Sequence, residues 1–190
     1  MAFLESGTGE SVVLVHGAEG DYRSWARQVA SRLRGFRLIA VSLRHYYPEP
    51  WDGKGDTFSV RQHAEDLALF IEALGVGPVY LVAHSRGGSV AVRTAQARPA
   101  LVKKLVLMEG AFGALLREKS ASGEGGASAV RRAVKARFEQ GDIDGGLELW
   151  IDRDTPGTWA RRKEEDRQRS LDNAWTLVVG DRAIQLPALT

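Results

Sequence analysis

Four short apolar runs recur along the first 110 residues, and a stretch with helical spacing separates each run from the next. Every run is continuously apolar, which is typical of strands buried on both faces of a parallel sheet. The runs lie at Val12–Val15, Leu38–Val41, Val79–Ala83 and Leu105–Met108. The helical stretches lie at Ser24–Leu33, Val60–Leu74 and Gly87–Ala97. This order predicts an α/β fold, with a mostly parallel sheet flanked by helices.

The bulk composition is that of an ordinary globular protein, with 190 residues of which 44% are apolar. The 26 basic and 24 acidic residues nearly balance, which argues against nucleic acid or an anionic membrane as the main partner. The sequence has no cysteine, so disulfides, thiolate catalysis and cysteine-based metal sites are excluded. Neither a signal peptide nor a membrane-length apolar run is present, and we expect a cytoplasmic protein.

The character of the sequence changes after residue 110. Gly113–Ser128 is rich in Gly, Ser and Ala and is typical of a loop or linker. Val130–Glu139 and Trp159–Asn173 have the pattern of charged, solvated helices. We therefore expect a core over 1–110, a helical lid or cap over 111–174, and the start of a C-terminal part of the core over 175–190.

The segment from Val79 to Gly88 places Ser85 between a buried strand and a helix. A tight turn at this point needs small flanking residues, and Ala83 and Gly87 provide them. The turn would raise the Ser85 hydroxyl above the sheet edge, at the N-terminus of the helix. The alternative is that Ser85 simply caps the helix.

A second segment, His16-Gly17, follows the first buried run. A glycine here allows the loop to fold over the sheet edge with its amides pointing inward. Acyl transfer needs two donors aimed at the developing oxyanion, and the N–H groups of Ala18 and Arg86 are the natural pair. The alternative is an ordinary loop between a strand and a helix.

Together these segments resemble the α/β-hydrolase superfamily of the serine-nucleophile type. The resemblance is carried by Leu14-Val15-His16-Gly17 with Trp25, by Leu81 to Gly88, and by Leu105 to Glu109. It implies the fold, a nucleophile at Ser85, an oxyanion hole at Ala18 and Arg86, and a lid in the later helical region. Family members with an aspartate nucleophile, such as haloalkane dehalogenases and epoxide hydrolases, are disfavoured because residue 85 is serine.

The acid and the base are harder to assign. In this family the chain order is serine, acid, histidine. The four histidines, at 16, 45, 63 and 84, all precede Ser85. His16 and His84 match structural positions, His63 is expected to pack in a helix, and His45 lies in a loop that could border the pocket.

Two acids are candidates. Glu109 follows a strand, and Asp181 follows a strand-like segment, Thr176–Gly180. A competing interpretation places that strand at Leu186–Thr190, so that the acid and histidine would lie beyond this sequence. The chain is then expected to be a truncated hydrolase, or a shortened relative that has lost catalysis or obtains a base in another way.

The sequence thus predicts a serine hydrolase acting on a small carboxylic ester or related carbonyl substrate, through an acyl-enzyme on Ser85. Carbon–carbon bond hydrolysis is a variant that the sequence does not separate. Tyr22, Trp25 and Trp51 are expected to line an apolar pocket, and no metal or cofactor is implied. The alternative is a non-catalytic relative that binds a small apolar ligand or a protein partner. An uncovered sheet edge also predicts self-association.

Overall fold

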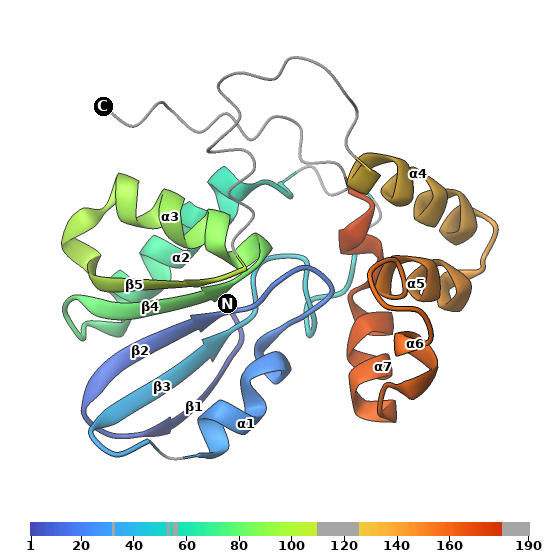
Figure 1. Ribbon diagram of the computed structural model, residues 1–190. Coiled ribbons are helices and arrows are strands. Elements are labelled where there is room, and N and C mark those ends of the chain that lie inside the picture. The colour runs from blue at the N-terminus through green and yellow to red at the C-terminus, as the bar shows by residue number, and fades with distance from the viewer. Residues whose placement is uncertain (32, 53, 55–56, 110–125, 180–190) are drawn as a thin grey trace.

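A computed structural model describes residues 1–31, 33–52, 54, 57–109 and 126–179, and its strands form one sheet (Figure 1). The strands are β1 Phe3–Gly7, β2 Glu10–Val15, β3 Phe36–Val41, β4 Val79–His84 and β5 Val102–Met108. Their order across the sheet is β1-β3-β2-β4-β5. Strand β1 runs antiparallel to β3, and the other neighbours are parallel. The predicted mostly parallel α/β sheet is confirmed.

Helices cover both faces of this sheet. The 3₁₀ helix η1 Tyr22–Trp25 and α1 Ala26–Ala30 pack on one face, and α2 Val60–Leu74 and α3 Arg86–Ala97 pack on the other. A short 3₁₀ helix, Pro99–Leu101, precedes β5. Helix α2 matches its predicted bounds because its apolar residues recur at helical spacing, and Ser59 caps it by accepting a hydrogen bond from the Gln62 amide.

The alternation of side chains along each strand divides the core into two layers. Val13 and Val15 of β2 point toward α2 and α3, where Leu67 and Ile71 are fully buried. Val12 and Leu14 point to the opposite face, where they pack against Trp25 and Val29. The apolar runs are continuous because both faces of the central strands are covered.

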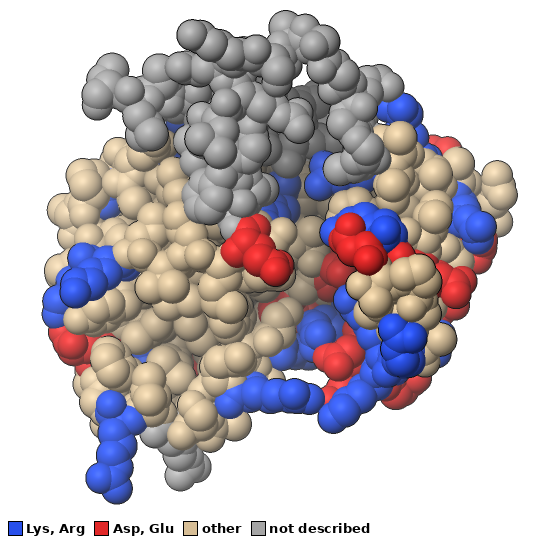
Figure 2. Space-filling model, viewed as in Figure 1, with Lys and Arg blue, Asp and Glu red and all other residues tan. Residues whose placement is uncertain are grey.

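The helices that follow β5 form a unit with its own apolar cluster, called here the helical unit. It comprises α4 Gly126–Glu139, α5 Ile143–Ile151, α6 Thr158–Arg161, α7 Glu164–Asp172 and the 3₁₀ helix η4 Ala174–Leu177. Figure 2 shows side chains of both charge signs gathered over this unit, and a hollow between it and the sheet. Within the described ranges, no helix is both long and apolar enough to span a membrane.

Several predicted boundaries were wrong. The first helix is shorter than Ser24–Leu33. The stretch Trp159–Asn173 forms two helices, because Arg162 and Lys163 are extended, with ψ of 142° and 151°. The interpretation of Thr176–Gly180 as strand-like is also wrong, since Thr176 and Leu177 belong to η4, Val178 is helical in its backbone, and Leu177 packs within the helical unit. Asp181, Leu186–Thr190 and most of the predicted loop Gly113–Ser128 lie outside the described residues.

Candidate functional site

Ser85 occupies the tight turn between β4 and α3, with φ of 49° and ψ of −119°. A positive φ is strained for a residue with a side chain and costs about 1–3 kcal/mol, so the surrounding structure must hold it. Part of that support is the hydrogen bond from the Ser85 amide to the Met108 carbonyl oxygen, at 2.9 Å. The Ser85 side chain makes no capping hydrogen bond. The alternative that Ser85 is a simple helix cap is therefore wrong.

Two glycines let neighbouring backbone approach this turn. A Cβ at Gly87 would lie 2.4 Å from the His16 carbonyl oxygen and 2.9 Å from that of Val15. A Cβ at Gly17 would lie 3.2 Å from the Ser85 Cβ and 2.8 Å from a ring nitrogen of His84. At Gly87, where the close atoms belong to the backbone, only glycine fits. The end of β2 and the turn at Ser85 are thus packed directly against each other.

His16 fixes the start of the loop that follows β2. Its Nε2 accepts a hydrogen bond from the Leu43 amide at 3.1 Å, so Nδ1 carries the proton and donates to the Gly17 carbonyl at 2.7 Å. Burial lowers the pKa of His16 to about 4, so the ring is neutral near pH 7. His16 therefore supports the backbone of the residues just ahead of Ala18.

The two predicted oxyanion donors lie at neighbouring strand ends. Ala18 follows β2, and Arg86 is the first residue of α3, where helix amides have no intrahelical partner. Strands β2 and β4 are adjacent and parallel, so both residues lie at the same sheet edge as Ser85. Their role as oxyanion donors remains a prediction.

His84 and Glu109 form a polar pair beside Ser85. His84 Nε2 lies 3.3 Å from Glu109 Oε2, and the Glu109 side chain is 87% exposed. Glu109 also has a positive φ, 48°, directly after β5. The structure thus places the predicted acid Glu109 against a histidine, namely His84, the residue directly before Ser85.

The other two histidines are held elsewhere. His63 of α2 is fully buried against Phe58, with ring centroids 5.0 Å apart, and burial lowers its pKa to about 3. His45 Nε2 lies 2.8 Å from Thr57 Oγ1. Within the described part of the chain, none of the four histidines hydrogen-bonds the Ser85 hydroxyl.

A cleft of about 330 Å³ lies between the loop after β2 and the helical unit. His84 and Met108 line it from the sheet, and Arg162 and Arg169 line it from the helical unit. Glu19 also lines it, with its Oε1 3.5 Å from Arg162 Nη2. Burial raises the pKa of Glu19, and the Arg162 charge opposes this rise.

The sequence pattern of the alpha/beta hydrolase fold family matches residues 10–143, which is more than half of the chain. The chain belongs to the alpha/beta hydrolase fold family. Strands β2 to β5, the turn at Ser85 and the loop after β2 all lie within the matched residues.

Individual relatives in this family are distant. (E)-2-((N-methylformamido)methylene)succinate hydrolase of Acinetobacter baylyi is 24% identical over 153 residues, which are 78% of this chain and 53% of that protein. Lipase LipV of Mycobacterium tuberculosis is 33% identical over 140 residues, which are 70% and 52% of the two chains. A structure described as a novel epoxide hydrolase from hot-environment metagenomes has a TM-score of 0.73 at 20% identity and covers 97% of this chain and 69% of its own. The chain spans about half the length of these two curated relatives.

The three predicted pocket aromatics of this hydrolase-fold chain lie in two apolar clusters, Trp25 and Tyr22 in one and Trp51 in the other. Trp25 is 7% exposed and packs against the sheet face that α1 covers. Tyr22 faces Tyr47, with ring centroids 6.2 Å apart. Trp51 packs on Phe58 and His45. The structure does not gather them around one pocket, although Trp25 borders the cleft described above.

The polar residues that join the loop after β2 to the helical unit carry no local sequence signal. Asp21 is fully buried and accepts hydrogen bonds from Arg23 and from Asn173. Asp21 and Asn173 are 152 positions apart, and no local pattern signals a contact over that separation. In the described ranges, no group of three or more His, Asp or Glu residues could hold a metal ion.

Proposed function

We propose that this protein is a serine hydrolase that acts on a small carboxylic ester or a related carbonyl substrate through an acyl-enzyme on Ser85. The observation that carries the proposal is the turn itself. Ser85 is held at a positive φ between β4 and α3, with a side chain that makes no capping hydrogen bond. Strain of this kind concentrates at functional sites. Relatives named as a hydrolase and as a lipase support the same reaction class.

In the proposed reaction, the Ser85 Oγ attacks the substrate carbonyl carbon and loses its proton to a base. The carbonyl oxygen becomes an oxyanion, which the amides of Ala18 and Arg86 and the N-terminal end of α3 stabilise. Collapse of this intermediate breaks the bond to the leaving alcohol, which takes up a proton. Water then attacks the acyl-enzyme, releases the acid and restores Ser85.

The presence of a general base that activates Ser85 distinguishes this proposal from its rival, a non-catalytic relative. Serine is a poor nucleophile without a base, and none of the described histidines hydrogen-bonds its hydroxyl. That observation favours the rival, a non-catalytic relative that binds a small apolar ligand or a protein. In the catalytic proposal, Ser85 is activated and reacts with a serine-directed reagent; in the rival it does not.

A fluorophosphonate probe tests the proposal on the whole chain. We expect Ser85 to be labelled, and we expect Ser85→Ala to lower the labelling rate by about a hundredfold or more. Ser89→Ala is the matched control, because Ser89 is a buried serine of the same helix and its loss leaves the turn intact. Absence of labelling in folded protein would contradict the proposal and favour the non-catalytic rival.

A further inference from the structure

The loop from Gly17 to Asp21 contacts the helical unit at three points. The Ala18 side chain packs against the apolar cluster of that unit. Glu19 Oε1 lies 3.5 Å from Arg162 Nη2. Asp21 Oδ2 accepts a 2.7 Å hydrogen bond from Asn173 Nδ2. The loop that carries the Ala18 amide is therefore in contact with helices that lie more than 140 positions later in the chain.

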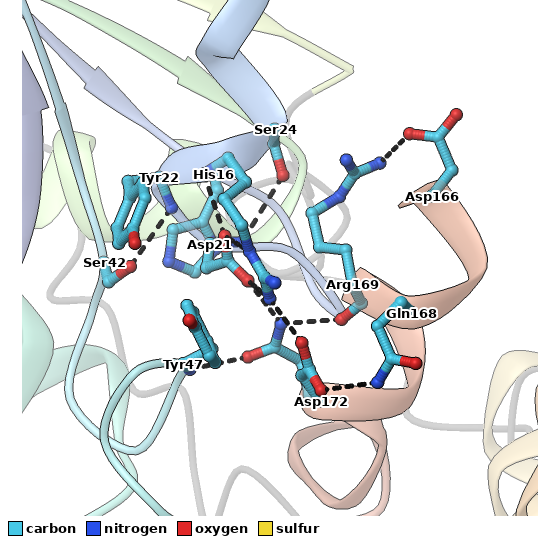
Figure 3. Close-up of polar contacts among 12 residues, drawn as sticks. His16, Asp21, Tyr22, Ser24, Ser42, Tyr47, Asp166, Gln168, Arg169 and Asp172 are labelled. Atoms are coloured by element: carbon cyan, nitrogen blue, oxygen red, sulfur yellow. Dashed lines mark hydrogen bonds and ion pairs between the residues drawn. The ribbon is translucent and has the colours of Figure 1, made fainter. Parts of the chain in front are cut away.

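Asn173 makes the shorter of the two polar contacts, the hydrogen bond to Asp21. It is 1% exposed, and both ends of its side-chain amide are used. Its Nδ2 donates to Asp21 and, at 2.8 Å, to the Arg169 carbonyl, while its Oδ1 accepts from the Tyr47 amide at 2.8 Å. The Asn173 side chain thus links the loop after β2, the loop after β3 and the end of α7. Its partners Asp21, Tyr47 and Arg169 lie close together in Figure 3.

Asp21 links the Asn173 hydrogen bond to the backbone of the loop. Its Oδ1 accepts from the Arg23 amide at 2.8 Å, and the Asp21 amide itself donates to Ser24 Oγ at 3.3 Å. Arg23 Nη2 then bridges Asp21 Oδ2 and Asp172 Oδ2, each at 2.7 Å. A buried carboxylate that depends on these donors loses much of its support when one of them is removed.

The loop needs such support, because it carries strain of its own. Glu19 has a positive φ, 54°, and its Oε2 has no hydrogen-bond partner among the described residues. A strained residue keeps its conformation only where its surroundings enforce it. The residue before it, Ala18, is the one whose amide must point at the oxyanion in the proposed reaction.

We propose that Asn173 is a positioning residue: through Asp21 it holds the loop after β2 in the conformation that aims the Ala18 amide at the reacting carbonyl. The helical unit is then a structural part of the oxyanion site as well as a wall of the cleft. This inference rests on the proposed function for its catalytic consequence. Its structural content, the restraint of the loop by Asn173, is measured without any reaction.

Amide hydrogen exchange on the whole chain tests the restraint. In Asn173→Ala, we expect exchange in a peptide covering 16–24 to rise by about tenfold or more, as loss of a hydrogen bond to a charged group implies. A peptide covering 79–90 should keep its exchange rate. The matched control is Arg167→Ala, since Arg167 of α7 bonds Asp144 and stacks on Trp159 inside the helical unit. That variant should leave the 16–24 peptide unchanged.

The near-isosteric Asp21→Asn provides a second route if Asn173→Ala does not fold, because it weakens the same contact from the loop side. Unchanged exchange over 16–24 in whichever of these variants folds would overturn the inference.

Labelling of Ser85 separates this inference from the proposed function. If wild-type protein reacts, Asn173→Ala should lower the maximal labelling rate about tenfold while the half-saturating probe concentration stays the same, because the lost restraint acts on the transition state. An equal maximal rate would overturn the catalytic role of Asn173. If wild-type protein does not react, the proposed function fails, and the exchange result still decides whether Asn173 restrains the loop.

Discussion

Gly87→Ala is expected to destabilise the folded chain by about 3 kcal/mol, although alanine is the better helix former. A new Cβ would lie 2.4 Å from the His16 carbonyl oxygen and 2.9 Å from that of Val15, and backbone atoms cannot move aside cheaply. In an open helical position the same change would stabilise by about 1 kcal/mol. Urea unfolding at constant pH measures the difference.

Gln96→Ala is the control for this change, because Gln96 lies in the same helix and is exposed. We expect its free energy of unfolding to stay within about 0.5 kcal/mol of the wild type. A Gly87→Ala variant as stable as Gln96→Ala would show that α3 and the end of β2 are not packed as closely as described. The account of the turn at Ser85 would then lose its geometric basis.

Acidification is expected to destabilise the chain between about pH 6.5 and pH 3. Burial lowers the pKa of His16 to about 4 and that of His63 to about 3, from an ordinary value of 6.5. Both groups therefore bind protons more readily when unfolded. The contribution of each neutral histidine to the free energy of unfolding is complete above pH 6.5. It is lost as the pH falls toward the folded-state pKa, and for His16 the loss is roughly 3 kcal/mol.

The variant His63→Phe separates this effect from general acid denaturation. Phenylalanine keeps an aromatic ring beside Phe58 and Tyr46, the aromatic neighbours of His63, and it does not titrate. Urea unfolding at several pH values between 7 and 4 should show a shallower loss of stability in the variant than in the wild type. Parallel curves for the two proteins would contradict a buried neutral histidine at this position.

The sheet and its main helices could be predicted from the sequence because their patterns are local. Continuous apolar runs marked β2 to β5, and regular spacing marked α2. Strand β1 was missed because its residues are mostly exposed and carry no buried run. Helix α5, which has buried residues, was missed because Gly145 and Gly146 interrupt its pattern.

In the candidate site, too, the features with a local sequence pattern could be predicted and the long-range contacts could not. The turn at Ser85 could be predicted from its immediate neighbours, and so could the need for small residues at Gly17 and Gly87, since strand ends of a parallel sheet meet at one edge. The contact between Asp21 and Asn173 could not, because it depends on how the helical unit packs on the core. The pocket role of Trp25 was assigned from its residue type, while its burial under the sheet is a property of the packed fold.

The most direct test of the central claim is to locate the acyl group after reaction with p-nitrophenyl acetate. The folded chain is incubated with the ester, quenched in acid, digested and mapped by mass spectrometry. Our account predicts an acetyl group on the peptide that contains Ser85, and its loss in Ser85→Ala with retention in Ser89→Ala. Acetylation at other residues alone, or none in folded protein, would contradict a nucleophilic Ser85.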